Sequence, residues 1–246
     1  MSYPFELEVR QEIVKAARLM HSRGLIAGHD GNISVRVGPG KLVCTPSGVN
    51  KGFIEEKDLV MVDLDGRLLR GGAEPSSEIR MHLQVYRRRD DVGCVIHAHP
   101  PHCVACTLVG IRLTEPVVPE AAFVLAPVPT APYATPGTEE VPRSIEPYIA
   151  TCRGILLERH GSLTVGADVR EAYNRLEALE HVAQLLFLAR NLGDVPPLSP
   201  EQVRSLKDVV TARGLPWGYP DSHGAFGLTD DIVRKVLEKL RQENGG

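Results

Sequence analysis

Two histidines, His97 and His99, follow a run of apolar residues that is typical of a buried strand, Val92-Gly93-Cys94-Val95-Ile96. Side chains of a strand alternate between its two faces, so we expect both imidazoles on the same face. Pro100 and Pro101 come next and predict that the strand stops there, at a sheet edge or mouth that a ligand can enter. Two neighbouring imidazoles supply half of a zinc site. The pair alone also fits two polar residues leaving the core, so a metal site requires a third ligand.

His160 is the candidate for that third ligand. It lies with Gly161 between two predicted strands, residues 154–158 and 162–165. We expect the glycine to give the backbone freedom to turn the imidazole toward a partner site. Three imidazoles with one open coordination position are typical of catalytic zinc, whereas structural zinc is normally closed by four protein ligands.

Glu78 is the candidate carboxylate beside this site. It follows Ser76 and Ser77 in the predicted first turn of a helix, where free N–H groups and the helix dipole favour negative charge. The same N–H groups and hydroxyls could hold a phosphate. Serine caps followed by an acid are also common without any function, and the turns Gly31-Asn32 and Thr45-Pro46-Ser47-Gly48 are ordinary when taken singly.

The order of predicted elements indicates the fold class. Helices are predicted at about 9–20, from within 74–78 to about 86, at 101–109, 139–150 and 168–192, from 199 and from 229, and strands at 33–37, 41–44, 59–64, 67–69, 92–96, 154–158 and 162–165. Asp65-Gly66 is typical of a tight hairpin turn. Hairpins mixed with helices predict an α/β protein with a mostly antiparallel central sheet and helices on both faces. We expect one domain over residues 1–246, with residues 213–246 as an extension that packs on it and buries aromatic side chains such as Trp217.

Composition limits the possible partners. The 246 residues carry a net charge of -3, with 43% hydrophobic and 24% charged residues, which is ordinary for a globular protein and does not indicate nucleic-acid or membrane binding. No apolar run reaches the roughly 18 to 20 residues of a membrane span, and the first residues lack the pattern of a signal peptide, so we expect none. The five cysteines are odd in number and fit a reducing compartment, so we expect a cytoplasmic protein. Three other histidines, His21, His82 and His181, lie on predicted helices among charged residues and are expected at the surface or at an interface.

Six motifs in this order resemble the class II aldolase/adducin family, and the resemblance spans residues from about 8 to 212. They are Gly31-Asn32-Ile33-Ser34, Thr45-Pro46-Ser47-Gly48, Pro75-Ser76-Ser77-Glu78, His97-Ala98-His99, Ala131-Pro132-Tyr133-Ala134-Thr135 and His160-Gly161. The ordered set is far more specific than any one motif. The resemblance implies a three-layer α/β/α domain, assembled as a cyclic homotetramer with active sites near subunit contacts.

The resemblance also implies roles for individual residues. His97, His99 and His160 would bind Zn²⁺, although imidazole sites also suit other divalent metals. Glu78 would be the acid/base and would close the zinc shell when substrate is absent. The substrate phosphate would be surrounded by Asn32, Thr45, Ser47, Gly48, Ser76 and Ser77.

The implied reaction is the cleavage of a ketose 1-phosphate to dihydroxyacetone phosphate and an aldehyde, through an enediolate whose charge zinc stabilises. One position departs from the family pattern: Phe123 stands where a tyrosine donates to the aldehyde-side oxygen, and phenylalanine has no proton to give. Glu120, Tyr133 or a water could substitute, and His29 could line the site. Phe123 favours an apolar sugar tail, as in a 5-deoxy or methylthio pentulose 1-phosphate, beside the L-fuculose 1-phosphate type.

Other activities of the same family remain open. A pentulose-phosphate 4-epimerase would let the cleaved aldehyde rotate and recondense, and a methylthioribulose-1-phosphate dehydratase would use the same metal to ease the loss of hydroxide. A different class is a non-catalytic, adducin-like binding module. The intact set of His97, His99, His160 and Glu78 argues against that module, because a scaffold does not need an open zinc position.

Overall fold

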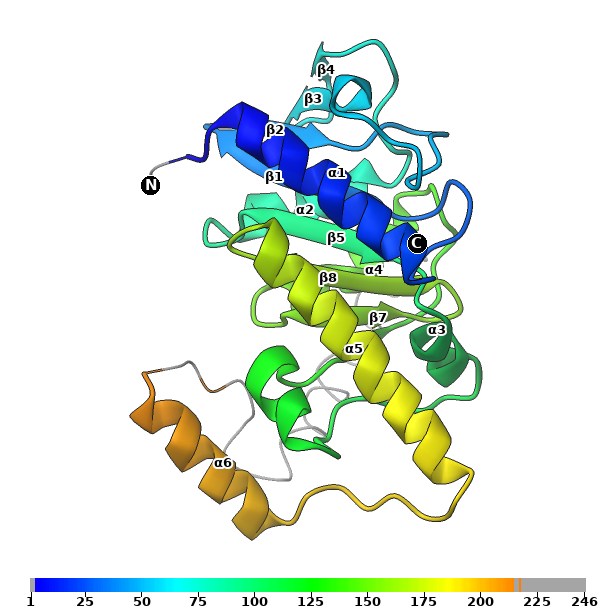
Figure 1. Ribbon diagram of the computed structural model, residues 1–246, viewed down its shortest axis with the longest axis vertical. Helices are drawn as coiled ribbons and strands as arrows, with labels where there is room; N and C mark the ends of the chain where they lie inside the picture. The colour runs from blue at the N-terminus through cyan, green and yellow to red at the C-terminus, as the bar shows by residue number, and fades with distance from the viewer. Residues whose placement is uncertain (1–2, 215–216, 218–246) are drawn as a thin grey trace, which may run out of the picture.

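The computed structural model describes residues 3–214 and Trp217 (Figure 1). Its centre is an eight-stranded sheet in the order β4-β3-β2-β1-β5-β8-β7-β6. Of its described strand pairs, β6 and β7 are parallel and the others are antiparallel, as predicted. The strands are β1 Asn32–Gly38, β2 Lys41–Cys44, β3 Val60–Asp63, β4 Leu68–Arg70, β5 Cys94–Ala98, β6 Thr130–Ala131, β7 Gly154–Leu157 and β8 Gly161–Gly166. The order of the strands could not be read from the sequence.

Helices cover both faces of the sheet. α1 (Glu6–Ser22) and α5 (Val169–Arg190) cross one face, and α2 (Ile79–Arg88) and α4 (Glu140–Ile149) pack behind the other (Figure 1). The remaining helical segments are α3 (Pro101–Leu108), α6 (Pro200–Ala212), the 3₁₀ turn η1 (Glu56–Asp58) and the π-helix η2 (Ala121–Leu125). Apolar side chains of each layer form a core on each side of the sheet, so the three-layer α/β/α prediction is confirmed.

Side-chain caps fix where the long C-terminal helices begin. Asp168 accepts a hydrogen bond from the backbone N–H of Glu171 at 2.8 Å, at the start of α5. The Glu171 carboxylate accepts in return from Ala167 at 2.6 Å, one residue before the cap. Ser199 and Gln202 form the complete capping box at the start of α6 that such a sequence predicts.

The start of α2 differs from the prediction. The helix begins at Ile79, so Glu78 precedes it instead of lying in its first turn. Ser76 causes this geometry, because its carbonyl accepts from the N–H of Ile79 at 3.0 Å and its hydroxyl accepts from the N–H of Glu78 at 3.3 Å. These two N–H groups are therefore already bonded within the chain.

The register of the sheet gathers the predicted site at one end. Asn32 at the start of β1 lies opposite His97 near the end of β5, and Gly161 at the start of β8 lies opposite Leu157 at the end of β7. Most of residues 213–246, the predicted extension, lie outside the described residues. Trp217, which is described, packs with Leu206 beside Ala122 and Ala126. None of the described helices has the length and apolar character needed to span a membrane.

Candidate metal centre and substrate site

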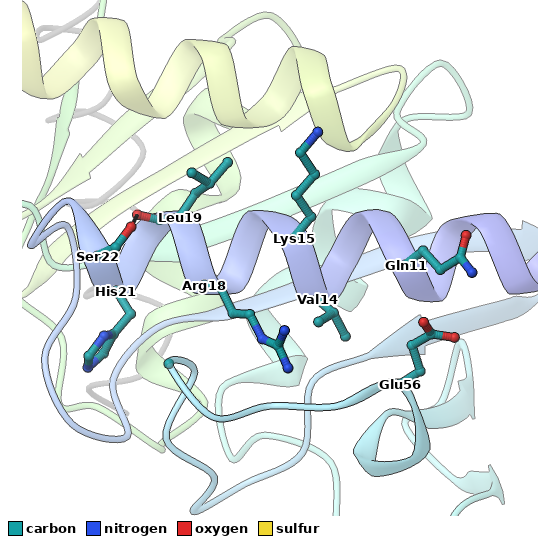
Figure 2. A pocket seen from close by; sticks show the side chains of 9 residues that line it. Gln11, Val14, Lys15, Arg18, Leu19, His21, Ser22 and Glu56 are labelled. Atoms are coloured by element: carbon teal, nitrogen blue, oxygen red, sulfur yellow. Dashed lines mark hydrogen bonds between the residues drawn. The ribbon is translucent and has the colours of Figure 1, made fainter.

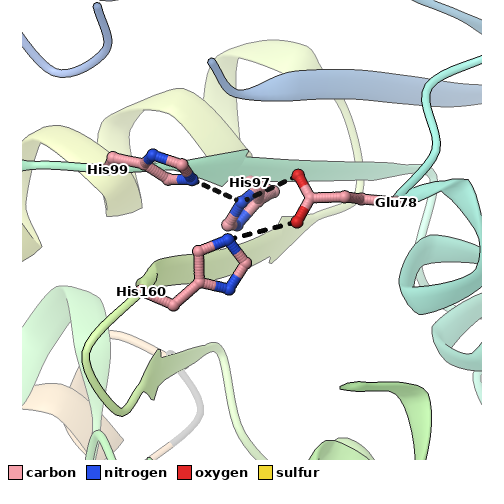
Figure 3. A group of neighbouring side chains, drawn as sticks. All are labelled: Glu78, His97, His99 and His160. Carbon is pink, nitrogen blue, oxygen red and sulfur yellow. Dashed lines mark hydrogen bonds and ion pairs between the residues drawn. The ribbon is translucent and has the colours of Figure 1, made fainter. Parts of the chain in front are cut away.

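Three imidazoles and one carboxylate meet at this end of the sheet (Figure 3). One potential ligand atom from each of Glu78, His97, His99 and His160 lies within 4.8 Å of the other three. The Nε2 atoms of His97 and His99 are 2.9 Å apart. Glu78 lies between two rings, with Oε2 3.2 Å from Nε2 of His97 and Oε1 3.1 Å from Nε2 of His160. The structure thus brings together the four residues that the sequence singled out as metal ligands and acid/base.

Backbone geometry delivers each imidazole. β5 ends at Ala98, directly before His99, as Pro100 and Pro101 predicted. His160 leaves a tight turn after β7, in which Arg159 takes a left-handed φ of 57°. Gly161 is needed for another reason than the predicted freedom to turn: a Cβ there would lie 2.3 Å from the carbonyl oxygen of Ala98. Only glycine permits this close approach of β8 to β5.

A hydrogen bond and a longer polar contact outside the cluster orient two of the rings. Nδ1 of the fully buried His97 lies 2.9 Å from the carbonyl oxygen of Ser162, which can only accept, so Nδ1 carries the proton and Nε2 presents a lone pair to the cluster. Nδ1 of His99 lies 3.4 Å from the Asp30 carboxylate. Such partners commonly fix the tautomer and direction of metal-binding histidines.

The electrostatics of the cluster favour a cation. Burial acts to raise the pKa of Glu78, but the rings of His97 and His160, when protonated, attract the carboxylate; this effect outweighs burial and lowers the pKa, so the carboxylate stays ionised. Burial, together with the neighbouring rings of His97 and His160, lowers the pKa of His99 to about 4, which keeps that imidazole neutral. Oε1 of Glu78 is buried, and its 3.1 Å contact with Nε2 of His160 does not have hydrogen-bond geometry. Lone pairs from one carboxylate and three imidazoles thus converge, and this donor set fits a divalent metal such as zinc.

The residues predicted to surround a phosphate lie on two loops that touch. Pro46 and Pro75 form an isolated bridge, and the N–H of Ser47 donates to the carbonyl of Glu74 at 2.9 Å. Ser47, Gly48 and Ser77 are exposed, whereas Ser76 is buried. The buried hydroxyl of Thr45 accepts from the N–H of Ile33 at 3.1 Å and so ties its loop to β1.

Asn32 belongs to the metal cluster as much as to the predicted phosphate loops. Its side-chain amide donates to Oε2 of Glu78 at 3.1 Å. Its Oδ1 is buried with no hydrogen-bond partner among the described residues. An acceptor in this state fits a bound hydroxyl or water, because buried polar atoms are nearly always paired.

The remaining predicted residues lie at different distances from the cluster. Tyr133 follows β6 at the same end of the sheet, is 57% exposed, and its N–H donates to Glu158 at 3.0 Å. His29 is exposed in the loop before Asn32. Phe123 and the exposed Glu120 lie elsewhere: the carbonyl of Phe123 accepts from Arg153, which precedes β7, whereas His160 follows that strand. Within one chain, the structure does not bring these two to the cluster.

Lys51 is the main residue that the sequence reasoning missed. It is only 2% exposed, and its Nζ donates to the carbonyl of His29 at 2.7 Å. Burial lowers its pKa, while the charges of Asp30 and Glu78 act to raise it. The ammonium therefore braces the loop that carries Asp30, the partner of His99. No sequence signal pointed to it, because a lysine in a polar turn is normally solvated.

A separate hollow of about 570 Å³ runs along α1 (Figure 2). Its lining includes Lys15, Arg18 and His21, and the Arg18 guanidinium already donates to the carbonyl of Ile54. The ring of His21 packs on Gly52, where a Cβ would lie 2.7 Å from its Nδ1. The hollow shares no residue with the metal cluster.

Comparison with known proteins agrees with this geometry. The family model described as Class II Aldolase and Adducin N-terminal domain matches residues 11–187. An L-fuculose phosphate aldolase of Methanococcus maripaludis is 35% identical over 181 residues, which cover 74% of this chain and 97% of the relative. The chain therefore belongs to the class II aldolase and adducin family.

Relatives with other names lie within the same range of similarity. A 5-deoxy-D-ribulose 1-phosphate aldolase of Bacillus thuringiensis is 34% identical over 193 residues, covering 78% of this chain and 90% of the relative. A 3-oxo-tetronate 4-phosphate decarboxylase of Escherichia coli K12 is 32% identical over 195 residues, with the same coverage. Among solved structures, an L-fuculose 1-phosphate aldolase superposes with a TM-score of 0.76 at 31% identity, covering 83% of this chain and 96% of that one.

Proposed function

We propose that this protein is a zinc-dependent aldolase that cleaves a ketose 1-phosphate to dihydroxyacetone phosphate and an aldehyde. The observation that carries the proposal is the convergence of Glu78 with His97, His99 and His160 at a mouth of the sheet. The names of the relatives support a sugar-phosphate substrate, and two of them are aldolases acting on 1-phosphates or fuculose phosphate. Aldol cleavage leaves negative charge beside a carbonyl, and a bound divalent metal supplies the Lewis acid that stabilises it.

The residues of the chain divide the remaining work. His97, His99 and His160 hold the metal, and the ionised Glu78 takes or gives the proton at carbon, a role worth roughly 10²–10⁴-fold in rate. The loops around Ser47 and Ser76 hold the phosphate as an anchor, so that binding energy orients the reacting carbons. Tyr133, whose exposed phenol can donate a proton, serves the aldehyde-side oxygen in place of a tyrosine at position 123.

The position of Phe123 fits a substrate with an apolar tail, such as a 5-deoxy pentulose 1-phosphate, and a site shared between copies. Since Phe123 and Glu120 lie away from the cluster of their own chain, they would contribute to the site of a neighbour in a homotetramer. Exposed apolar side chains offer a surface for that assembly. They lie in and directly after the last turns of α3 and α5, namely Leu108, Val109, Phe187, Leu188 and Leu192. We place the enzyme in the cytoplasm, consistent with its five free cysteines.

The test is a panel of ketose 1-phosphates incubated with zinc-loaded protein while dihydroxyacetone phosphate is measured. Release should require the metal, should fall to background in His97→Ala and by at least 10²-fold in Glu78→Gln, and should prefer deoxy over fully hydroxylated sugars. Glu139→Gln, an exposed carboxylate paired with Arg80, is the matched control and should leave release unchanged. Metal-loaded protein that releases nothing from any sugar contradicts the proposal and points to the epimerase or dehydratase.

Decarboxylation is the second candidate, because one relative is named as a decarboxylase of a phosphorylated 3-oxo acid. Loss of carbon dioxide from such an acid also leaves negative charge beside a carbonyl, so the same metal and phosphate loops would serve. Carbon dioxide release from a phosphorylated 3-oxo acid, without aldol cleavage, would favour this activity over the aldolase.

A further inference from the structure

α2 and β1 carry polar residues at matching intervals along the interface that they share. Four helical residues rise about 6 Å, and two strand residues rise about 6.6 Å. Residues four apart on the helix therefore meet residues two apart on the strand. Counting from the residue before α2, the helical set is Glu78, His82 and Tyr86, and the strand set is Asn32, Ser34 and Arg36.

Hydrogen bonds join the two sets into a ladder that runs inward from the metal cluster. Asn32 donates to Glu78 at 3.1 Å. The hydroxyl of Ser34 lies 2.7 Å from Nδ1 of His82 and 3.0 Å from the hydroxyl of Tyr86. Arg36 donates to the carbonyl of Tyr86 at 2.9 Å and lies over its ring, 5.0 Å from the centroid.

The donor and acceptor of each hydrogen bond in the ladder can be assigned by starting from Tyr86. Tyr86 donates to the carbonyl of Ser34 at 2.7 Å, and a carbonyl can only accept. The Tyr86 oxygen is thus free to accept from the Ser34 hydroxyl, which in turn accepts from Nδ1–H of His82. His82 is fully buried and neutral, and its Nε2 is an acceptor with no hydrogen-bond partner among the described residues. His82 lies inside the chain and not at the surface or an interface, as its charged neighbours in sequence had suggested; those neighbours, such as the exposed Arg80, lie on other faces of α2.

We propose that His82 is a positioning residue for Glu78: it locks α2 to β1 and so fixes where the carboxylate lies between His97 and His160. This inference rests on the role of Glu78 in the proposed function. Glu78 directly precedes α2, and its side chain makes no capping hydrogen bond to that helix. The position of the carboxylate therefore depends on how α2 packs on the sheet. A slide or rotation of α2 by one residue would break the rungs at Ser34, and a displacement of about 1 Å at a reacting group can cost 10²-fold in rate.

The variants His82→Asn and His82→Leu separate positioning from packing. Asparagine places an amide N–H where Nδ1–H lies in histidine, so it keeps the donor to Ser34, whereas leucine fills similar space without a donor. Leu83→Ala, buried on the same helix but outside the ladder, is the control for lost packing. Ser34→Ala, which removes only one hydroxyl group, replaces His82→Leu as the test variant if His82→Leu does not fold.

The readouts are Co²⁺ titration of the metal-free full-length protein, followed by visible absorption, and kcat and KM of the zinc-loaded enzyme. We expect His82→Leu to weaken Co²⁺ binding and lower kcat, each by about 10–100-fold, with KM within about twofold; Ser34→Ala should do the same by a smaller factor. His82→Asn should recover most of both, and in a Glu78→Gln background His82→Leu should change Co²⁺ binding no further. Unchanged Co²⁺ binding in folded His82→Leu, or equal losses in Leu83→Ala, would overturn the inference. Because the Co²⁺ titration needs no substrate, it decides the inference even if no sugar phosphate is cleaved.

Discussion

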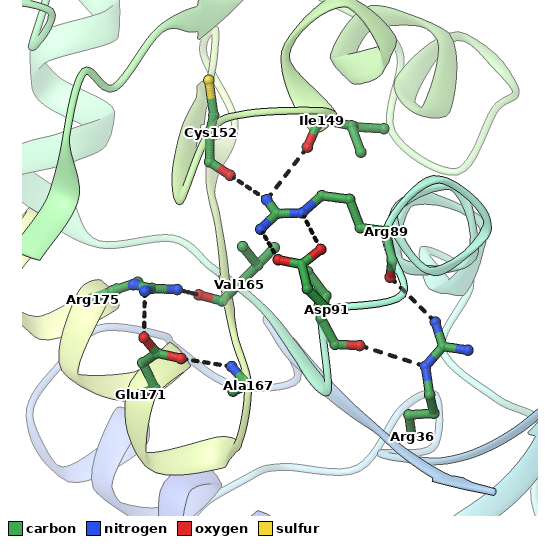
Figure 4. Close-up of polar contacts among 10 residues, drawn as sticks. Arg36, Arg89, Asp91, Ile149, Cys152, Val165, Ala167, Glu171 and Arg175 are labelled. Carbon is green, nitrogen blue, oxygen red and sulfur yellow. Dashed lines mark hydrogen bonds and ion pairs between the residues drawn. The ribbon is translucent and has the colours of Figure 1, made fainter. Parts of the chain in front are cut away.

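The two ends of the same sheet satisfy their polar groups in opposite ways. At the metal end, acceptors converge: the Glu78 carboxylate meets imidazole lone pairs, and Oε1 of Glu78 and Oδ1 of Asn32 lack hydrogen-bond partners among the described residues. At the other end, arginine donors meet backbone carbonyls (Figure 4). Arg89 donates to the carbonyls of Cys152 at 2.9 Å and Ile149 at 3.4 Å, and Arg175 donates to that of Val165 at 2.6 Å.

This difference separates the end of the sheet that binds a ligand from the end that stabilises the fold. Buried groups with matched partners contribute to stability, whereas unmatched acceptors cost stability unless a ligand supplies the missing partner. Arg36, Arg89 and Arg175 direct guanidinium donors to carbonyls at the end of the sheet far from the site. At the metal end, the amide of Asn32 donates to the Glu78 carboxylate and the ammonium of Lys51 donates to the His29 carbonyl.

The sharpest test of this contrast is Glu78→Gln, measured for both activity and stability. We expect kcat to fall by about 10²–10⁴-fold because the proton carrier is lost. In metal-free protein at pH 8, the free energy of unfolding should change by no more than about 1 kcal/mol, because glutamine keeps an acceptor for the Asn32 amide. Initial rates and urea unfolding in the presence of a chelator give the two values. A loss of several kcal/mol in unfolding free energy would show that Glu78 holds the fold, and the contrast would fail.

The second test is the pH dependence of stability that His82 contributes. Burial, with a smaller effect of the neighbouring His97, lowers the pKa of His82 to about 3, and the charge of Glu78 only partly opposes this. Between its ordinary pKa of about 6.5 and 3, the unfolded chain binds a proton that the folded chain excludes. This contribution to stability is therefore complete above pH 6.5 and is lost as pH falls, by up to about 1.4 kcal/mol per pH unit.

Urea unfolding of the metal-free protein at pH 6.5, 5.5 and 4.5 measures this slope. His82→Asn cannot titrate, so its stability should fall less steeply with acid than that of the unaltered chain. Parallel curves for the two proteins would mean that His82 does not stay neutral in the fold.

Much of this molecule could be predicted from the sequence because its signals are local. The period of two placed His97 and His99 together, caps such as Ser199 set helix starts, and hairpin turns indicated an antiparallel sheet. The order of the strands could not be predicted, since pairing between β1 and β5 joins residues far apart in the chain. The residues that support the site without belonging to the metal cluster could not be predicted either.

Lys51 and His82 show why the supporting residues were missed. Each is a polar residue in a polar stretch, and only the tertiary fold buries it against a distant partner, the carbonyl of His29 or the hydroxyl of Ser34. Gly161 shows a subtler limit: its importance was predicted, but the cause is the approach of Ala98 from another strand, not the conformation of its own turn.

Arg89→Met tests the other end of the sheet. The guanidinium is largely buried and joins the loop after α2 to the loop before β7, so its removal leaves carbonyls without donors. We expect the free energy of unfolding to fall by about 1.5–3 kcal/mol, with kcat, KM and metal content unchanged. This pattern is the reverse of Glu78→Gln, and a drop in kcat for folded Arg89→Met would show that the two ends are coupled.

Asp91→Asn has the smallest expected effect. It tests whether Arg89 stabilises that end through its ion pair with Asp91 or through its hydrogen bonds to backbone carbonyls. Asp91 accepts from Arg89 at 3.0 Å, and the hydrogen bond with Arg89 lowers its pKa, but the carboxylate is 66% exposed. Solvent screens such a pair, so the free energy of unfolding should fall by no more than about 1 kcal/mol. Arg89 keeps both carbonyl acceptors in this variant, which is why the loss should be well below that of Arg89→Met. Equal losses in the two variants would mean that the ion pair, not the bridging of two loops, holds this end of the sheet together.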